Sequence, residues 1–465
     1  MSGDRAWAAA LRAACERPEV TASAWRAGGG QVVGLLGWSA PSELVTAAGL
    51  LPVRLSPDRL TRVGPRRGSG GAPGPGGTSE ADGVGRSGDA PGPAGSDSVG
   101  RSGGVAWPAG RDAAAAFGRE LAPATAALAA ALLSGALDWI DFLLIGRDRE
   151  DYTRLFYLLR ELRRDGAAPG LVPVAFFDLL RLPSRTSARY NRQRAAELTT
   201  VIAGWADRPV TPADLAGAVE AAGGIARSFR DIQTLRSRPQ PAITGTGALA
   251  AAIAARVLPA GELRPLLDAA LTAAAADAPG PRASGCNAGP GLAVPGLAVP
   301  GLAAPGPVAG AARVFLAGSA VDDLTAYQAV ENLGLAIVGE DHEWGDDGSE
   351  YPRVTRDPLD GIVDRYHFAH GGAARAGLRD RVERTAGRVR AAAADGVLYL
   401  LGPHDEAVGW ELPALRERLG AGIPVVPVRL ADLGAGDTAP DGYGGWPELS
   451  EAGRRLLAKL VTSHG

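Results

Sequence analysis

Cysteine and lysine are nearly absent from this chain of 465 residues. The two cysteines, Cys15 and Cys286, are too few and too far apart for a disulfide framework or a four-thiolate metal site. Lys459 is the one lysine, so the chain cannot form the glycine-rich phosphate loop that ends in Lys-Ser or Lys-Thr. These absences argue against a disulfide-stapled protein, a thiolate zinc site and a P-loop ATPase.

A charge excess and long apolar runs are also missing. Lys and Arg number 48 against 51 Asp and Glu, a formal net charge of −3, which argues against a nucleic-acid binder that relies on bulk positive charge. No run of 18 apolar residues free of charge, Gly or Pro occurs, and the first residues lack a secretory apolar region. We therefore expect a cytoplasmic protein with neither nucleic acid nor membrane as a partner.

Glycine (65 residues) and proline (35) are abundant, and they concentrate in two stretches. Residues 64–110 combine scattered charge with almost nothing apolar to bury, so we predict a disordered insert. Residues 278–311 contain the repeat PGLAVPGLAVPGLAAPG, whose prolines exclude both helix and central strand and predict a linker.

Elsewhere, short apolar runs alternate with helical patterns in two similar blocks, which predicts parallel sheets covered on both faces. The fold class expected is α/β, with two doubly wound (flavodoxin/Rossmann-like) domains facing each other and a helical segment between them. The predicted strands are 31–37, 50–55, 139–145 and 171–176 in the first block, and 313–317, 335–338, 396–401 and 424–428 in the second. The predicted division is an N-terminal helical segment (1–30), a first α/β domain (31–182), a helical domain (183–277), the linker (278–311) and a second α/β domain (312–465).

Ligands of open α/β sheets bind beyond the carboxyl ends of the strands, so the loops that follow the strands are the places to look. The first such loop carries Ser39 and Glu43. Glu43 has two equally good interpretations, a catalytic base or ligand anchor on the one hand and a complement to the helix dipole on the other. In the second block, Gly318 and Ser319 place backbone N–H groups where an anion is favoured.

Several other patterns have a structural interpretation that outweighs the functional one. The glycines at 28–30 and 245–247 lack the spacing of a dinucleotide fingerprint and predict turns. His342–Asp346 imitates a zinc-protease helix, but it contains a glycine and ends in an acid. His367 and His370 could share a helix face and bind a metal, yet no third ligand lies nearby. Four arginines spaced by three and four could hold phosphates or form a solvated helix face: Arg181, Arg185, Arg189 and Arg192.

Five segments resemble, in the right order, those of the 2-hydroxyacyl-CoA dehydratase and benzoyl-CoA reductase D-component family. VVGLLGWSAPSELVTAAGLLPVRL (32–55) is similar to the family's PEE-[LI]-xx-AAG-xx-PVR element, with Ser42 in place of the first glutamate. The segment LDWIDFLLIGRDREDYTRLFYLLREL (137–162) resembles its Asp- and Cys-bearing strand and helix. The later segments are 313–341, 357–367 and 394–426. The resemblance covers the folded part of the chain outside the two inserts.

The departures from the family concern its iron–sulfur cluster, which the resemblance places on three loop cysteines. The closest register puts Arg149 at one cysteine position and His404 at another, with the accompanying acid kept as Asp405. The third position, near residues 117–119, has no cysteine either. Arginine cannot ligate iron and one histidine cannot hold a cubane cluster, so we expect no metal and no cofactor in this chain.

The resemblance further implies an acyl-CoA substrate in a cleft containing Ser39 and Glu43. It also implies a homologous cysteine-bearing partner subunit with its own [4Fe-4S] cluster, and an ATP-dependent activator that supplies the electron. Three hypotheses stay open. The chain is a cluster-free subunit of a dehydratase-type lyase that contributes an acyl-CoA cleft, or a non-catalytic paralogue that binds or scaffolds the cluster-bearing subunit. In the third, Arg149, His404 and Asp405 converge in the emptied pocket for new acid–base chemistry.

Overall fold

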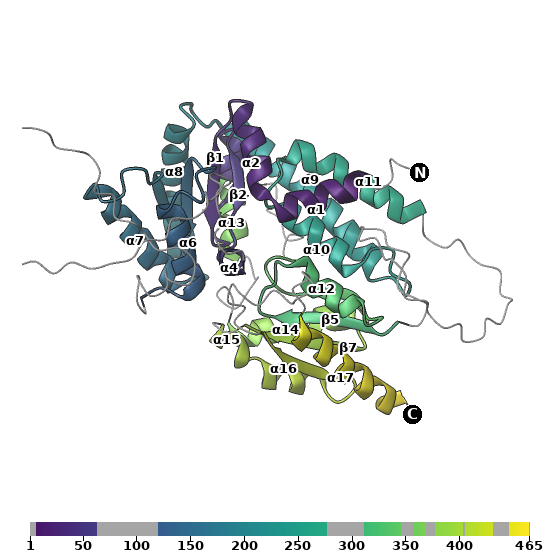
Figure 1. Cartoon of the computed structure of the whole chain (residues 1–465). Helices are drawn as coiled ribbons and strands as arrows, with labels where there is room; N and C mark the ends of the chain where they lie inside the picture. The colour runs from purple at the N-terminus through teal and green to yellow at the C-terminus, as the bar shows by residue number, and fades with distance from the viewer. Residues whose placement is uncertain are drawn as a thin grey trace, which may run out of the picture.

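The structure is a computed structural model of the whole chain, and the residues it describes are 6–62, 120–276, 311–345, 355, 357–368, 377–402, 405–430 and 446–464. The predicted insert 64–110 and all but the last residue of the predicted linker 278–311 lie outside the described residues. Figure 1 shows two sheet-containing units with a group of helices beside them.

The first unit is built on a four-stranded, all-parallel sheet. Its order is β2-β1-β3-β4, the doubly wound order in which the chain moves first to one side of β1 and then to the other. Every residue of β1 is buried, as expected for a central strand covered on both faces. The strands are β1 (Val32–Leu36), β2 (Leu51–Arg54), β3 (Phe142–Gly146) and β4 (Val174–Phe177).

The second unit repeats this arrangement. Its sheet has the order β6-β5-β7-β8, again with all pairings parallel. The strands are β5 (Arg313–Gly318), β6 (Ala336–Glu340), β7 (Gly396–Leu401) and β8 (Val425–Arg429). The predicted fold class, two doubly wound parallel sheets with helices between them, is confirmed.

The helices N-terminal to the linker include several long ones between the two sheets. Around the first sheet lie α2 (Pro18–Ala27), α3 (Ser42–Ala47), α4 (Pro57–Arg62), α6 (Pro123–Leu133) and α7 (Glu150–Arg164). After β4 come α8 (Arg185–Trp205), α9 (Pro212–Arg236), α10 (Gly245–Ala254) and α11 (Ala260–Ala276).

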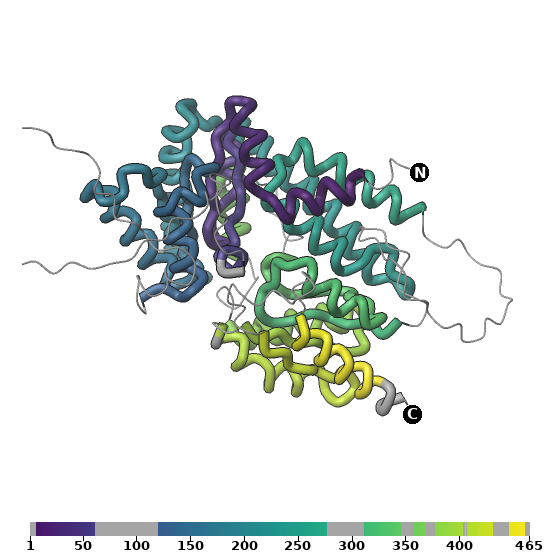
Figure 2. Tube along the Cα trace, viewed as in Figure 1, coloured from purple at the N-terminus to yellow at the C-terminus, as the bar shows by residue number. Residues whose placement is uncertain are grey.

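Five helices accompany the second sheet in the described residues that follow the linker, apart from α13. They are α12 (Leu324–Glu331), α14 (Leu378–Ala391), α15 (Glu406–Gly409), α16 (Leu412–Leu419) and α17 (Pro447–His464). In the view of Figure 1 and Figure 2, α9, α10 and α11 lie beside the first unit and above the second.

The helices of residues 183–277 contribute buried residues to two different hydrophobic cores. Ala195, Leu198 and Ile202 of α8 are buried with the first sheet. Leu249 and Ile253 of α10 are buried with the strands of the second sheet. Helix α9 contacts both α3 and β6, so this segment joins the two units.

Two helices pack on the unit that lies far from them in sequence. Helix α1 (Ala6–Glu16) buries Trp7 and Leu11 in the core of the second unit, against α10 and α11. Helix α13 (Pro358–Phe368) buries Ile362 and Tyr366 in the core of the first unit, against α8 and α9. Figure 1 shows α13, in green, among the purple and blue elements of the first unit. Each unit is therefore covered in part by a helix whose neighbours in sequence belong to the other unit.

Candidate functional site

Glu43 is a buried acid at the carboxyl end of the first sheet. It lies in the first turn of α3, directly after the loop that follows β1, and is 2 % exposed. The Arg365 guanidinium donates to its Oε1, and the Tyr366 hydroxyl donates to its Oε2 at 2.7 Å. Both donors come from α13, so a helix more than 300 residues away completes the environment of Glu43.

A cavity of about 190 Å³ adjoins Glu43. It lies between the first sheet with α3 on one side and α9, the α10–α11 connection and α13 on the other. Its walls are mostly apolar, and the charged side chains that line it are Glu43, Arg54, Arg256 and Arg365. A cavity of about 150 Å³ accommodates benzene, so this one has room for a small acyl group but not for a whole coenzyme.

Trp38 forms one wall of this cavity, and two arginine side chains lie over its ring. The guanidinium carbons of Arg54 and Arg256 lie 4.7 and 5.3 Å from the centroid of its ring, within the range of cation–π attraction. The ring also meets Trp344 of the second unit edge to face, with centroids 5.2 Å apart. Trp38 therefore contacts both the cavity and a residue of the second unit.

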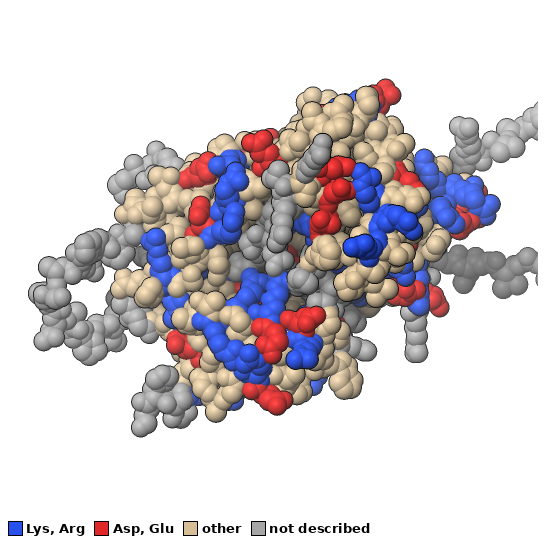
Figure 3. Space-filling view, turned by 180° about the vertical axis from the view of Figure 1, so that it is seen from behind, with Lys and Arg blue, Asp and Glu red and all other residues tan. Residues whose placement is uncertain are grey.

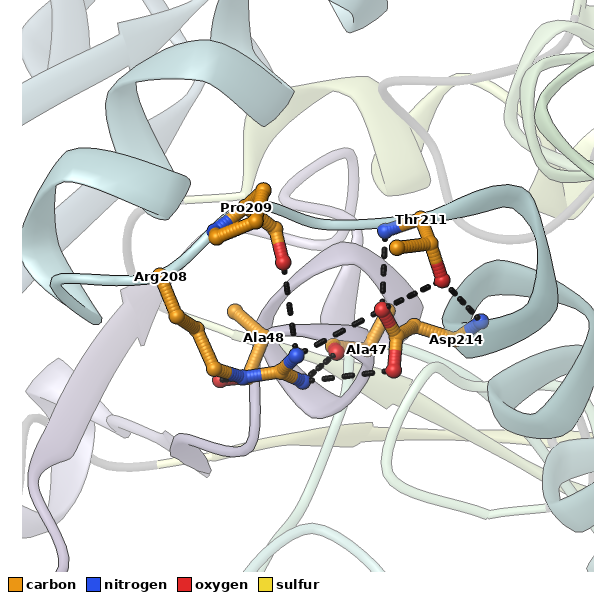
Figure 4. A network of polar contacts seen from close by, with 6 residues as sticks. All are labelled: Ala47, Ala48, Arg208, Pro209, Thr211 and Asp214. Carbon is orange, nitrogen blue, oxygen red and sulfur yellow. Dashed lines mark hydrogen bonds and ion pairs between the residues drawn. The ribbon is translucent and has the colours of Figure 1, made fainter.

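Helix α3 is held at its C-terminal end by Arg208, as Figure 4 shows. The Arg208 side chain donates to the carbonyl oxygens of Ala47 (2.6 Å) and Ala48 (2.9 Å), which have no partner within the helix. It also contacts Asp214, which forms a capping box with Thr211 at the start of α9. Hydrogen bonds from Thr211 and Arg208 lower the pKa of Asp214 to about 2. Arg208 thus fixes the helix that carries Glu43 against α9.

Ser39, a predicted catalytic residue, is not among the residues that line the cavity. It is 1 % exposed, and both its backbone N–H and its hydroxyl donate to Asp148 Oδ2 at 2.9 Å. Asp148 in turn accepts from Arg181 at 2.8 Å. Gly37, with φ 83°, allows this approach, because a Cβ there would lie 2.3 Å from Asp148 Oδ2.

The second unit repeats this contact. The Ser319 hydroxyl lies 3.2 Å from Asp405 Oδ2 and accepts from the Gly402 N–H at 2.8 Å. Gly318 has φ 102°, and its N–H donates to Asp341. The predicted substrate-binding pair, Gly318 and Ser319, therefore uses these polar groups to join the loops after β5, β6 and β7.

The repeat aligns the two loops that carry the predicted cluster positions. Asp148 and Asp405 are equivalent through their serine contacts, and the residues that precede them are Arg147 and His404. The assignment of Arg149 and His404 to cysteine positions of the family stays a prediction. Arg147 forms an ion pair with Asp178 at 2.8 Å and is half-exposed.

Arg149 and Asp405 of the predicted emptied pocket have separate polar partners among the described residues. Arg149 donates to Asp151 at 3.1 Å and lies 5.7 Å from the Tyr152 ring centroid. Asp405 contacts Ser319 in the other unit, and His404 lies outside the described residues. Convergence of Arg149, His404 and Asp405 stays a prediction.

The other sequence patterns have structural partners where they are described. His342 is buried and lies 2.8 Å from the Tyr327 hydroxyl, while Trp344 packs on Trp38, and Asp346 lies outside the described residues. His367 Nδ1 lies 2.7 Å from Asn191 Nδ2 at the interface of α13 and α8, whereas His370 is not described.

The glycines at 245–247 open α10, and a carboxylate of the protein occupies that N-terminus. Glu331 accepts from the Gly245 N–H at 2.6 Å and from the Thr246 hydroxyl at 2.6 Å. Burial raises the pKa of Glu331, which the hydrogen bonds from Gly245 and Thr246 partly offset. An external phosphate would compete with this carboxylate, which supports the structural interpretation of the motif.

Two of the four spaced arginines, Arg181 and Arg192, form ion pairs with acids of the protein. Arg181 pairs with Asp148, and Arg192 pairs with Asp357 and Asp360. On the face drawn in Figure 3, Lys and Arg side chains lie among Asp and Glu instead of forming a continuous basic surface.

The described residues do not fit an iron–sulfur cluster. Within them, no group of three His, Cys, Asp or Glu side chains is arranged to hold a metal ion. Cys15 is their one cysteine; its thiol donates to the Ala250 carbonyl at 3.1 Å, and burial raises its pKa to about 12. A thiol with that pKa stays protonated at neutral pH, whereas cluster ligands are thiolates. Cys286 lies outside the described residues.

Sequence reasoning found Glu43 but missed five of the residues around it. Trp38 and Arg54 belong to the segment that carries the family resemblance, although their roles were not predicted. Arg256 reaches the site from the α10–α11 connection, and Arg365 and Tyr366 reach it from α13; no local sequence signal marks such contacts. The apolar spacing of α13 indicates a helix but not the unit on which it packs.

Comparison with known proteins agrees with this architecture. No curated protein matches the chain. None of the helices in the described ranges has the length and apolar content needed to cross a membrane. Residues 37–432, which include every strand except β1 and most of the residues that line the cavity, match the family described as 2-hydroxyglutaryl-CoA dehydratase, D-component. The chain therefore belongs to the 2-hydroxyglutaryl-CoA dehydratase D-component family.

Proposed function

We propose that this chain is a subunit of a dehydratase-type complex that binds an acyl-CoA with its acyl group in the cavity beside Glu43. The observation that carries the proposal is the cavity itself, which lies at the carboxyl end of β1 in a chain of this family. Its volume suits a small acyl group, and its apolar walls suit the hydrocarbon part of one.

Glu43 is the proposed reactive group of this chain. The Arg365 guanidinium beside it favours the carboxylate form, and the Tyr366 hydroxyl fixes its orientation. A carboxylate held in this way accepts a hydrogen bond or a proton from a ligand group that enters the cavity. Ser39 acts as a positioning residue, because it ties the loop before α3 to Asp148.

The proposed subunit holds no iron–sulfur cluster of its own. Cluster chemistry then belongs to a homologous cysteine-bearing partner, which an ATP-dependent activator reduces. Support comes from the side chain at one expected ligand position, since Arg149 forms an ion pair with Asp151. Guanidinium groups have no lone pair with which to bind iron.

The second candidate is a non-catalytic paralogue that binds or scaffolds a cluster-bearing subunit. The observation that favours it is that Ser39 and Ser319, both predicted site residues, use their hydroxyl groups within the protein. In this candidate the cavity is a remnant and Glu43 is a structural contact between α3 and α13.

Calorimetric titration of the purified chain with butyryl-CoA separates the two candidates. The proposal predicts saturable binding by the unaltered chain and at least tenfold weaker binding by Glu43→Gln. Glu383→Gln, in an exposed pair with Arg418, serves as the matched control and should bind normally. The absence of butyryl-CoA and succinyl-CoA binding, both to the lone chain and to its complex with a cysteine-bearing homologue, would favour the paralogue.

A further inference from the structure

The cavity beside Glu43 is long rather than round. It is lined by the first turn of α3 at Glu43 and by its last turn at Thr46, and by Leu51 and Arg54 from the two ends of β2. In an extended strand, Leu51 and Arg54 lie roughly 10 Å apart. The cavity therefore follows β2, the edge strand of its sheet, from the carboxyl end of the sheet toward the amino end.

The charged residues that line the cavity, in the described part of the chain, gather at its carboxyl end. Glu43 and Arg365 form their ion pair at the first turn of α3, and Arg54 is the last residue of β2. The Arg256 guanidinium lies over Trp38, which belongs to the loop after β1. The lining residues near the start of β2 carry no charge: Trp25, Thr46, Gly49, Leu50 and Leu51. The cavity thus has a polar end and an uncharged end.

The cavity opens to solvent at its uncharged end. Thr46 and Gly49 are the exposed residues among its described lining, and they lie where α3 ends and β2 begins. Trp25 borders the same end, because a Cβ on Gly30, shortly before β1, would lie 2.2 Å from its indole nitrogen. A chain that fills the cavity can therefore extend past Thr46 into solvent.

The volume of the cavity fits one unbranched hydrocarbon chain. A cavity of about 150 Å³ holds the six carbons of benzene, so one of about 190 Å³ holds roughly eight carbons. Because this volume is spread along β2, it is narrow, and a single chain uses it better than a ring does. The wall formed by α9 includes the small side chains of Ala218, Ala221 and Ala222, which leave this space beside the strand.

We infer that the cavity binds an unbranched hydrocarbon chain of roughly eight carbons, with its polar head beside Glu43 and its tail toward the opening at Thr46. Each methylene buried against the walls tightens binding about fourfold. Two molecules share this chemistry. One is an acyl-CoA thioester, in which case the inference rests on the proposed function. The other is a free fatty acid, which would bind whether or not the chain binds coenzyme A.

Titration with two series of probes that differ only in chain length tests the inference. One series is butyryl-, hexanoyl-, octanoyl- and dodecanoyl-CoA, and the other is the four corresponding free acids. In at least one series, we expect the octanoyl member to bind the unaltered chain at least twentyfold tighter than the butyryl member. The dodecanoyl member should bind no tighter than the octanoyl member, because its tail lies beyond the opening.

Two variants assign these effects to the cavity. Ala222→Leu fills space beside α9 and should weaken binding of the octanoyl probe at least tenfold, with little change for the butyryl probe. Thr46→Trp closes the opening at an exposed position and should weaken binding of the dodecanoyl probe more than that of the octanoyl probe. Ala216→Leu, at an exposed position of α9, is the matched control and should bind every probe as the unaltered chain does.

The outcomes separate this inference from the proposed function. Length-dependent binding of the thioesters supports both, and length-dependent binding of the free acids alone supports the inference only. Thioesters bound equally at every length overturn the inference and leave the proposed function standing. Failure of both series to bind overturns the inference, as does affinity that keeps rising at dodecanoyl and ignores Ala222→Leu, which indicates adsorption to the surface. The length series on the unaltered chain and Thr46→Trp decide the matter should Ala222→Leu fail to fold.

Discussion

Glu43 owes its environment to residues that the chain brings from far away. Its two carboxylate oxygens accept hydrogen bonds from consecutive residues of α13, so the acid and its donors form a small buried network. The sequence left two interpretations of Glu43 open, a functional anchor and a helix-dipole complement. The structure adds a structural role to these two. Glu43 is a contact between α3 and α13, and both helices line the cavity.

We predict that Glu43→Gln lowers the free energy of unfolding by about 2–3 kcal/mol, because it removes the buried negative charge that pairs with Arg365. Chemical denaturation measures the change. Arg365→Gln should cost a similar amount, and the double variant should lose clearly less than the sum, since the two residues interact directly. Additive losses would contradict the pairing.

Cys15 should behave as an inert core residue rather than as a metal ligand. Burial raises its pKa from the ordinary 9.0 to about 12. In a Cys286→Ser variant, we expect iodoacetamide to label the native chain at pH 8 at least a hundredfold more slowly than the denatured chain, because thiolate is the reactive form. Rapid labelling of the native chain would contradict the burial of Cys15.

The raised pKa of Cys15 also makes the free energy of unfolding depend on pH. Above pH 9 the unfolded chain loses the Cys15 proton while the folded chain keeps it, up to about pH 12. The folded state then binds more protons than the unfolded state, so this residue makes the free energy of unfolding fall as the pH rises through that range. Cys15→Ala should show a shallower decline.

At the scale of elements, α3 is a short helix that depends on its neighbours. Six residues form too few internal hydrogen bonds for independent stability, so the contacts at its ends matter. Arg208 supplies two of them at the C-terminal end (Figure 4). Tyr366 supplies another near the N-terminal end, where its hydroxyl oxygen accepts from the Ser42 N–H at 3.3 Å.

We expect Arg208→Ala to lower the free energy of unfolding by about 1 kcal/mol and to weaken ligand binding in the cavity, because α3 carries Glu43. Thermal unfolding and calorimetric titration with the probe that binds best measure the two effects. Arg164→Ala, which removes an exposed arginine of α7, is the matched control. Loss of stability without any change in affinity would show that Arg208 does not position Glu43.

Elements with a strong local pattern were predictable from the sequence. The apolar runs at 31–37 and 396–401 correspond to β1 and β7, because continuous apolar runs between turn residues are typical of strands buried on both faces. The positions of α1 and α13 were not predictable. Each is amphipathic, but an apolar face does not indicate which distant surface covers it.

In the candidate site, too, some residues were predictable from the sequence and others were not. Glu43 and the serines after β1 and β5 could be found from their place at strand ends. The contacts of Ser39 with Asp148 and of Ser319 with Asp405 could not, because they join loops across neighbouring strands. Arg256 carries no signal in its local sequence, and only the packing of the α10–α11 connection on β2 brings it to Trp38.

At the scale of the whole molecule, the two units are tied together by reciprocal packing. Helix α1 is buried in the second unit and α13 in the first, while Trp38 meets Trp344 between them. The buried ion pair of Arg236 with Glu340, at 2.7 Å, joins α9 to β6. The cavity beside Glu43 therefore depends on the arrangement of the entire chain.

The central claim is that this family member offers a ligand cavity but no cluster ligands of its own. Its most direct test is the iron and acid-labile sulfide content of the chain, purified without oxygen and treated with ferrous iron, sulfide and a thiol reductant. We predict no stoichiometric iron and no iron–sulfur absorbance in the lone chain, with iron present only after a cysteine-bearing homologue is added. Close to four irons per lone chain, lost on Cys286→Ser substitution, would contradict the account.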